Sequence, residues 1–365
     1  MKTLYVINSP SWTEIAPAGL NNVKMFDDVL SENFTYFYFN LMKYKLINKV
    51  VIFVPKKRWR LDNIIRKTIK TDFGTMEIRS DDKKFEDINS DPCFNFVYCW
   101  ADIEECEKIR NKFVIVDNQF HGYIKKSGIN KKIHDLVLTE SENFINYIPK
   151  NIPTQVYKLI SYDHENSKIR NSLKNEKLYD WIMISSFDKR KRHLEFLNSL
   201  KKNGLSDLKG CIIGRDPNNK TKKITDIFKL SPWKILNKVK KLQKSMNFDI
   251  FINVHQKKKI ELSLKSKVYV NSSILDSGPR AQVEVMQMNI PVLSMPHIGS
   301  SDLIEIGKNG EISENINDIP LKLKKILDNY DNYSLNTFKK YLSSDVIMPK
   351  LVQNIMQFYN KKFHE

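Results

Sequence analysis

Short runs of apolar residues alternate with longer amphipathic segments along almost the whole chain. In its first part, six runs have the length and the β-branched or aromatic content of buried strands. They are residues 4–7, 49–54, 76–78, 94–100, 113–116 and 136–138. Amphipathic segments between these runs predict helices, which are residues 23–30, 62–69 and 103–110. This alternation predicts an α/β fold with a doubly wound sheet.

The same alternation begins again after a polar stretch near residues 161–177. Strand-like runs then recur at residues 181–184, 210–213, 251–254, 267–271 and 292–293. Because single hydrophobic cores stop growing at roughly 250–300 residues, a chain of 365 residues is expected to form two domains. We place them at residues 1–160 and 178–335. Residues 336–365 form a C-terminal helical segment whose pattern allows packing on either domain.

One helix of the second domain is predicted in detail. Ser231 has the side chain of an N-cap, and Pro232 suits the first helical position. Ile235, Leu236 and Val239 recur on one face of this helix, while lysines occupy the other face. The pattern predicts a surface helix with a basic outer face. Such a face is typical of a solvated surface, and it also suits contact with a nucleic acid or a membrane.

The positive charge is concentrated in one third of the chain. Lys+Arg 60 and Asp+Glu 42 give a net charge of +18. Residues 166–280 hold 27 basic and 10 acidic side chains, whereas residues 1–165 hold 24 and 22. The basic character therefore belongs to the second domain. Such a field attracts the phosphates of a nucleotide, a nucleic acid or a membrane surface. A lysine-rich composition with a solvated surface is the alternative explanation for many of these lysines.

Composition excludes several classes of protein. Hydrophobic residues at 41% and charged residues at 28% are typical of a soluble globular protein and exclude wholesale disorder. No apolar run approaches the roughly 18–20 residues of a membrane span, and the start lacks a signal-peptide segment. We therefore expect a cytoplasmic protein, with peripheral contact at the inner membrane face as a variant. The four cysteines show neither a CxxC pair nor zinc-ligand spacing, so we interpret them as packing residues.

The segment of residues 268–312 carries the most informative chemistry. A strand leads through a turn containing Gly278 into a helix that begins at Arg280. Such a turn presents free backbone N–H groups at a helix N-terminus, which favours a phosphate, and glycine permits close approach. Arg280 and Glu284 share a helix face, so the cation can meet a diphosphate while the carboxylate binds a ribose diol. An ordinary exposed ion pair beside a turn has the same spacing.

This segment resembles the donor-site motif E-x7-E of the family 4 glycosyltransferases, which have the GT-B fold. Asp276 and Glu284 have that spacing, although the first acid is Asp and not Glu. Residues 289–292 resemble the G-x-P-V sequence of the family, and residues 307–310 resemble its N-G turn. The similarity therefore extends along the helix, the next strand and the turn after it.

An upstream segment is similar to the same family. Residues 181–187 and then 189–192 resemble the first donor-domain strand and its R-x4-K phosphate-binding loop. The next strand and turn end at Gly214, which we expect to contact the donor. Lys191 falls on the lysine position of this loop. Ser186 stands where the family has arginine, so the second cation must come from another residue. The candidates are Arg190, Arg192 and Arg280.

The resemblance implies a GT-B fold, in which two Rossmann-like domains face a central cleft and a C-terminal helix can return to the N-terminal domain. It also implies transfer of a sugar from a nucleotide-diphosphate sugar, UDP- or GDP-linked, to a hydroxyl of a glycan or glycolipid, with retention. Lys191, Arg280 and the turn at Gly278 would stabilise the departing diphosphate. Glu284 would hold the ribose, and Asp276 would position the sugar. The chain has no D-x-D triplet, so we expect no metal and no cofactor, and nothing indicates an obligate protein partner.

The first domain would bind the acceptor. Gly19 lies in the loop after the first strand, where related enzymes place a glycine near the donor phosphates. His121 follows the strand at residues 113–116, on the ligand side of an open sheet. The resemblance gives His121 a contact with the transferred sugar, and a plain surface histidine is the alternative. Arg58 and Arg60 belong to a basic, aromatic-bearing stretch that suits an anionic acceptor, a membrane, a nucleic acid or simply solvent.

Two other functions are open at this stage. A phage-type glycosyltransferase acting on hydroxymethylated bases in DNA is favoured by the net charge of +18. It is disfavoured by the position of that charge, because a duplex would be held largely by the acceptor domain and the cleft. An inactive basic protein that only binds sugar nucleotides is the other alternative, and the departures at Ser186 and Asp276 motivate it.

Overall fold

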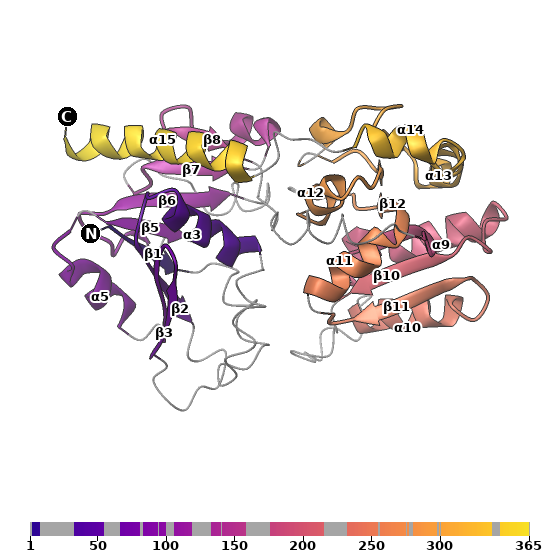
Figure 1. Cartoon of the computed structure of the whole chain (residues 1–365), viewed down its shortest axis with the longest axis horizontal. Helices are drawn as coiled ribbons and strands as arrows, with labels where there is room; N and C mark the ends of the chain where they lie inside the picture. The colour runs from indigo at the N-terminus through magenta and orange to yellow at the C-terminus, as the bar shows by residue number, and fades with distance from the viewer. Residues whose placement is uncertain are drawn as a thin grey trace. The chain divides into compact units, whose positions relative to one another are not determined.

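The structure is a computed structural model that divides the chain into two compact units (Figure 1). The first unit contains Met1–Ser161 and Tyr341–Glu365, and the second contains Tyr162–Lys340. The residues that it describes are 2–7, 33–54, 66–80, 83–93, 95–99, 106–118, 133–139, 141–157, 176–214, 232–254, 256–274, 276, 280–297, 299, 301–337 and 344–364.

An eight-stranded sheet forms the centre of the first unit, in the order β3-β4-β2-β1-β5-β6-β7-β8. Its strands are β1 (Thr3–Ile7), β2 (Lys49–Val54), β3 (Arg66–Thr71), β4 (Gly74–Ser80), β5 (Phe96–Cys99), β6 (Phe113–Asn118), β7 (Leu136–Thr139) and β8 (Thr154–Val156). Every pair is parallel except β3 and β4. The inner six strands have the order of a Rossmann sheet, with the reversal between β1 and β5.

The C-terminal helix packs on this first unit. The helices of the unit are α3 (Asn33–Lys43), α5 (Lys84–Ser90), the 3-10 helix η2 (Glu142–Tyr147) and α15 (Ser344–Phe363). The buried face of α15 brings the ring of Tyr359 to 4.8 Å from that of Phe96 in β5. Lys362 Nζ lies 2.6 Å from the carboxylate of Asp135, just before β7. The chain therefore returns to its first unit, as the GT-B fold implies and as Figure 1 shows for the yellow helix.

A wholly parallel sheet of six strands forms the centre of the second unit, in the order β11-β10-β9-β12-β13-β14. Its strands are β9 (Tyr179–Ile184), β10 (Gly210–Gly214), β11 (Phe248–Ile252), β12 (Ser266–Asn271), β13 (Val292–Ser294) and β14 (Gly310–Ile312). This is again the Rossmann order, with the reversal between β9 and β12. The α/β class and the two Rossmann-like domains predicted from the sequence are confirmed.

Helices cover both faces of the second sheet. They are η3 (Lys189–Lys191), α9 (His193–Lys202), α10 (Pro232–Leu242), α11 (Gln256–Leu264), α12 (Arg280–Gln287), η6 (Ser301–Leu303), η7 (Ile316–Asp318), α13 (Ile319–Asp328) and α14 (Tyr330–Leu335). Apolar residues of α9, α10 and α13 form one cluster with Val268 and Val270 of β12. Because side chains alternate along a strand, Tyr269 points to the opposite face, where it lies near the charges of Asp276 and Glu284.

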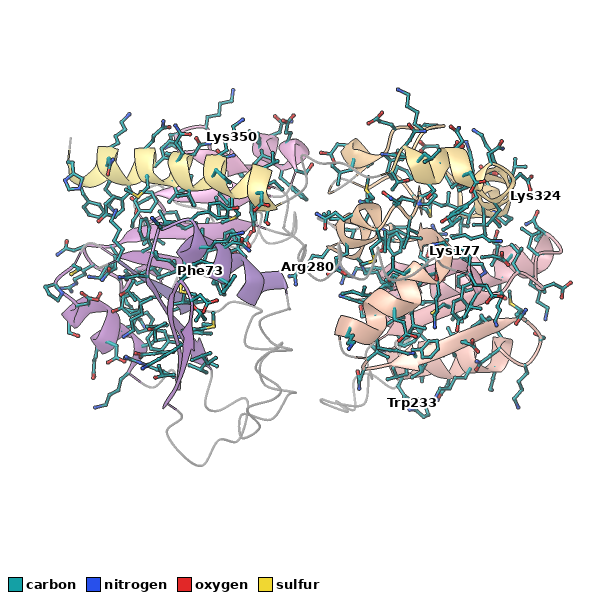
Figure 2. The ribbon with its side chains drawn as sticks, in the orientation of Figure 1. Phe73, Lys177, Trp233, Arg280, Lys324 and Lys350 are labelled. Carbon is teal, nitrogen blue, oxygen red and sulfur yellow. The ribbon has the colours of Figure 1, made fainter. Side chains whose placement is uncertain are left out.

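The predicted surface helix is confirmed as α10. Ile235, Leu236 and Val239 are buried, whereas Lys238 and Lys240 are exposed. Trp233 is half exposed at its first turn and is labelled in Figure 2. Ser231, the predicted N-cap, lies outside the described residues. Among the helices that the structure describes, none is both long enough and apolar enough to cross a bilayer.

Three predicted elements differ from the structure. The segment predicted as a helix at 62–69 contains the start of β3, whose six residues pair antiparallel with β4. The strand predicted at 251–254 is β11, which begins earlier because Phe248 pairs with Gly210; the hydroxyl of Tyr179 donates to Asp249 within it. The helix predicted to run to Arg110 ends at Cys106 among the described residues.

Candidate active site in the second unit

The candidate site lies where the strand order of the second sheet reverses. In open α/β sheets, ligands bind beyond the carboxyl ends of the strands at this position. The two strands on either side of the reversal are β9, which ends at Ile184, and β12, which ends at Asn271. The segments that follow them contain the residues that the sequence singled out.

The structure brings Lys191 and Asp276 together although they are 85 residues apart. Lys191 ends the short helix η3, and its ammonium group forms an ion pair with the Asp276 carboxylate. Two hydrogen bonds hold the backbones of their segments side by side. Ser272 Oγ donates to the carbonyl of Lys191 at 2.7 Å, and the backbone N–H of Ile274 donates to the carbonyl of Arg190 at 3.1 Å. The lysine and the acid therefore form one unit of the site.

Glu284 lies on α12 with only 2% of its side chain exposed. Its counter-charge is Lys259 on α11, whose Nζ is 2.9 Å from Glu284 Oε2. Arg280, labelled in Figure 2, is the first residue of α12, one turn before Glu284. Lys259 was not predicted from the sequence. Its contact depends on how α11 and α12 pack against β12, and the interval of 25 residues to Glu284 carries no periodic signal.

His297 is a second residue that the sequence analysis missed. Its Nε2 lies 2.9 Å from Asn271 Nδ2 and 3.0 Å from Ser294 Oγ, at the ends of β12 and β13. Because Asn271 Oδ1 accepts from the N–H of Ser273, it is the amide nitrogen of Asn271 that faces His297 Nε2. Desolvation by burial lowers the pKa of His297, so the ring is neutral at pH 7. Its position directly after a strand end was the available signal.

The three arginines that could supply the cation missing at Ser186 have different surroundings. Ser186 itself is exposed in the segment between β9 and η3. Arg190 forms an ion pair of 3.1 Å with Asp188. Arg192 has a left-handed backbone, and its Nη1 lies 3.3 Å from the sulfur of Met295. Arg190 and Arg192 stand on either side of Lys191 in the chain, and Arg280 begins the helix that follows Asp276.

The two predicted glycines of the donor site have different outcomes. Gly214 ends β10 and is buried, and a Cβ on it would lie 2.3 Å from the ring of Phe187. Packing alone therefore accounts for this glycine, and its contact with a donor stays a prediction. Gly278 lies outside the described residues, although Asp276 and Arg280 on either side of it are described.

A small pocket adjoins η3. Its volume is about 140 Å³, and Asp188, Arg192, His193 and Lys238 are among its lining residues. It is smaller than the roughly 300–1,000 Å³ typical of a site for a drug-sized ligand. His193 has its Nε2 3.1 Å from Ser185 Oγ, and burial lowers its pKa to about 3. The ring is therefore neutral, and it lies buried at the start of α9, close to η3.

The predicted residues of the acceptor domain, Gly19, Arg58, Arg60 and His121, lie outside the described residues. Among the described residues, the strand before His121 carries a buried carboxylate at Asp117, the next-to-last residue of β6. Tyr98 donates a hydrogen bond to Asp117, and the hydroxyl of Tyr157 is 3.0 Å from it. Burial raises the pKa of Tyr98 well above its usual value. These tyrosines fix the Asp117 carboxylate at the ligand side of the first sheet.

Comparison with known proteins finds a family match for the second unit. Residues 165–341 match the family described as glycosyl transferases group 1. No curated protein matches the chain. Three solved structures of similar fold are a sucrose-phosphate synthase from Thermosynechococcus elongatus, a trehalose-phosphate synthase from Burkholderia xenovorans with glucose-6-phosphate, and HepE from Anabaena with UDP and glucose.

These likenesses cover nearly the whole chain at low identity. The sucrose-phosphate synthase is 10% identical, with a TM-score of 0.67 and 100% of both chains covered. The trehalose-phosphate synthase is 8% identical, with a TM-score of 0.67, and 98% of this chain and 100% of that chain are covered. HepE is 10% identical, with a TM-score of 0.59, and the coverage is 99% and 98%. The fold is GT-B, and residues 165–341 within it match the model of the glycosyl transferases group 1 family.

Proposed function

We propose that this protein transfers a sugar from a nucleotide-diphosphate sugar, UDP- or GDP-linked, to a hydroxyl of a glycan or glycolipid, with retention and without a metal ion. The observation that carries the proposal is the Lys191–Asp276 ion pair at the strand reversal, together with the buried carboxylate of Glu284, since both acids act on Tyr269 of β12. This is the position at which Rossmann-like sheets bind nucleotides.

The geometry supports a division of labour among these groups. Negative charge develops on the diphosphate as the glycosidic bond breaks, so preorganised cations and N–H donors lower the barrier. Lys191 and the N-terminus of α12, where Arg280 lies, supply that positive potential. Glu284 can accept hydrogen bonds from the two ribose hydroxyls. Asp276, which pairs with Lys191, would orient the hydroxyls of the sugar.

Ligands in the similar structures support a sugar-nucleotide donor. One structure of HepE contains UDP and glucose and another contains UDP-glucose, while the trehalose-phosphate synthase contains glucose-6-phosphate. These ligands belong to those proteins. Together with the family match, they favour a sugar hydroxyl as the acceptor and a nucleotide sugar as the donor for this chain.

The proposal is tested by thermal shift with UDP-, GDP-, ADP- and CMP-sugars. A ligand that binds only the folded state raises the apparent melting temperature, and at 100 times its Kd the gain is about 2.7 kcal/mol. We expect one UDP- or GDP-sugar to stabilise the protein, and Lys191→Ala and Glu284→Gln to remove most of the shift. Lys324→Ala is the matched control, because Lys324 is an exposed lysine on α13 of the same unit. If no sugar nucleotide stabilises the wild-type protein at saturation, the donor assignment is wrong.

Retention and metal independence are tested by two separate measurements. The anomeric configuration of the product is read by NMR against that of the donor sugar. Turnover is expected to be unchanged after dialysis against EDTA, because Lys191 and the α12 N-terminus would do the work that a divalent cation does elsewhere.

A second candidate acceptor is DNA with hydroxymethylated bases, favoured by the net charge of +18. An electrophoretic mobility shift assay with duplex DNA distinguishes this candidate from a glycan or glycolipid acceptor. A DNA-modifying enzyme would bind at physiological salt with a steep dependence on salt concentration, because binding releases counterions. We expect only weak binding that is lost between 50 and 200 mM salt, and no transfer to the duplex.

A further inference from the structure

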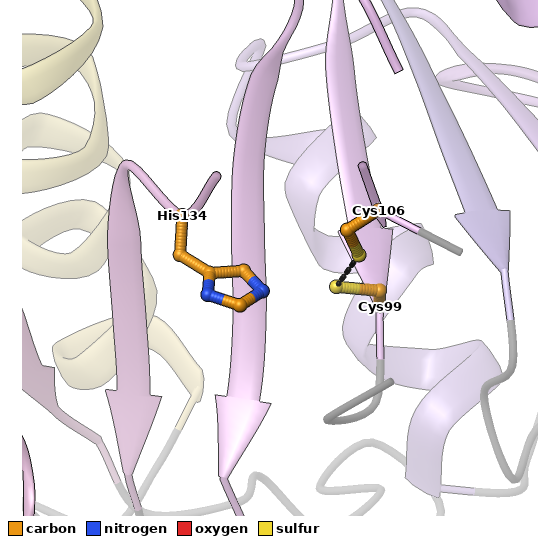
Figure 3. Close-up of side chains that lie close together, drawn as sticks. All are labelled: Cys99, Cys106 and His134. Atoms are coloured by element: carbon orange, nitrogen blue, oxygen red, sulfur yellow. Dashed lines mark hydrogen bonds between the residues drawn. The ribbon is translucent and has the colours of Figure 1, made fainter. Parts of the chain in front are cut away.

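Three residues with metal-ligating side chains lie together in the core of the first unit (Figure 3). Cys99 is the last residue of β5, Cys106 follows it on the next segment, and His134 stands just before β7. Their exposed fractions are 0%, 1% and 1%. The three side chains come from separate segments of the unit and are enclosed by its core. The proposed transfer chemistry uses none of them.

Their spacing fits a shared ion. The two sulfur atoms are 3.2 Å apart, and one ligand atom from each residue lies within 4.8 Å of the others. A disulfide needs about 2.05 Å between the sulfurs, so the two cysteines form none. Cys106 Sγ instead donates a hydrogen bond to Cys99 Sγ, and Cys99 Sγ donates to the carbonyl of Ile115 at 3.6 Å. Two thiolates on a tetrahedral ion with metal–sulfur bonds of about 2.3 Å would be about 3.8 Å apart. A small rotation of either side chain therefore opens the pair to that separation.

We propose that Cys99, Cys106 and His134 bind a thiophilic d10 metal ion, with Zn²⁺ as the expected ion. Thiolate and imidazole ligands select Zn²⁺ and Cu⁺ over the hard cations. Two thiolates and one Zn²⁺ carry no net charge, and a neutral cluster is the least costly to bury. Cu⁺ would leave one negative charge in the core. The fourth position of Zn²⁺ would be taken by water or another ligand, as in three-ligand zinc sites.

The ion would have a structural role. It would link the end of β5, the segment at Cys106 and the start of β7. In the sheet, β5 and β7 each pair with β6 and are not neighbours. Each thiol gives its proton to solvent on binding, so two protons are released per ion and the apparent affinity rises with pH. The site is separate from Lys191 and Asp276, which belong to the second unit. Dialysis against EDTA therefore tests only whether the donor site needs a metal ion. A buried thiolate site would release its metal slowly and could keep it through the dialysis.

The full-length protein, reduced and kept anaerobic, is incubated with one equivalent of Zn²⁺, Co²⁺ or Cu⁺ and desalted. We expect about one equivalent of Zn²⁺ to be retained, and Co²⁺ to give a thiolate charge-transfer band in the near ultraviolet. Cys106→Ser and His134→Gln are expected to lose the band and most of the retained zinc. Cys211→Ser is the matched control, because Cys211 is a buried thiol of the second unit. Preferential retention of Cu⁺ in competition with Zn²⁺ would support the site and would identify Cu⁺, not Zn²⁺, as its ion.

Two results would overturn the proposal. The first is wild-type protein that retains no more metal than Cys106→Ser. The second is a disulfide between Cys99 and Cys106 that survives the reductant used in the metal assay, seen as a mass about 2 Da below that of the denatured and fully reduced chain. If Cys106→Ser does not fold, wild-type protein alone decides: the Co²⁺ band must reach its endpoint at one equivalent and vanish on denaturation. A band without an endpoint would count against a defined site.

Discussion

The buried carboxylate of Glu284 has its counter-charge on a different helix, and this arrangement makes the pair sensitive to the loss of either member. Removing one partner of a buried ion pair leaves an uncompensated charge in a low-dielectric environment. Lys259 keeps 19% of its side chain exposed, so water reaches part of the pair. A ribose that binds Glu284 would have to share this carboxylate with Lys259 or displace it. In the proposed donor site, the pair would therefore be a structural contact and would also supply the carboxylate for the ribose.

Lys259→Met is expected to destabilise the second unit by about 3 kcal/mol, at the low end of the range for a broken buried pair. The free energy of unfolding from urea titration measures the loss. Lys258→Met is the matched control, because Lys258 pairs with Glu261 at the surface, where both side chains are more than one third exposed. Such pairs contribute only about 0.2–1 kcal/mol. Equal losses in the two variants would show that the Lys259–Glu284 pair is not buried in solution.

His193 gives the second unit a dependence on acid. Burial lowers its pKa to about 3, whereas an unfolded histidine has a pKa of about 6.5. Between these values the unfolded chain binds a proton that the folded chain excludes, so stability falls as the pH falls through 6.5. Relative to His193→Gln, the wild-type protein is expected to lose about 2 kcal/mol between pH 7 and pH 5. Urea titrations at both pH values measure it. Parallel pH profiles for the two proteins would mean that the ring is accessible to protons.

At the scale of elements, strands buried on both faces were the most predictable parts of the chain. Their continuous apolar runs, such as residues 49–54, are rich in β-branched residues, and this combination favours a strand buried on both faces. The β3–β4 hairpin was missed because Ile64, Ile65 and Ile69 have helical spacing, while the pairing of β3 with β4 overrides that local preference. Boundaries such as the start of β11 depend on a pairing partner, which no local pattern contains.

Gly214 offers a test that separates packing from ligand contact. Gly214→Ala is expected to destabilise the second unit by about 1–3 kcal/mol, because the new methyl group overlaps the ring of Phe187. Adding Phe187→Leu would make room and restore part of that stability, as a thermal unfolding curve would show. If the double variant regains stability but still fails to bind a sugar nucleotide, Gly214 contacts the donor as well. An unchanged stability in Gly214→Ala would contradict the packing argument.

At the scale of the whole molecule, the restart of the alternating pattern predicted two Rossmann-like units, and the family resemblance supplied the candidate site. The spacing of Asp276 and Glu284 could be read because both lie in one short segment. Three other contacts could not be predicted from the sequence, since each joins segments that meet only in the folded unit. They are the Lys259–Glu284 pair, the hydrogen bonds of His297 and the Cys99–Cys106–His134 cluster. Packing of the C-terminal helix on the first unit was one of two possibilities that its amphipathic pattern left open.

That helix is expected to be indispensable to the first unit. The four largest buried side chains of α15 are Met348, Leu351, Ile355 and Tyr359. At about 1.5–3 kcal/mol each, their burial contributes about 6–12 kcal/mol, which matches the 5–15 kcal/mol that a whole domain retains. A chain ending at residue 343 should therefore lose the unfolding transition of the first unit in calorimetry and keep that of the second. Val346→Ala, on the exposed side of α15, is the control and should keep both transitions. Two intact transitions in the truncated chain would mean that the first sheet closes its core without α15, because the lost apolar contacts would then have to be replaced from within residues 1–161.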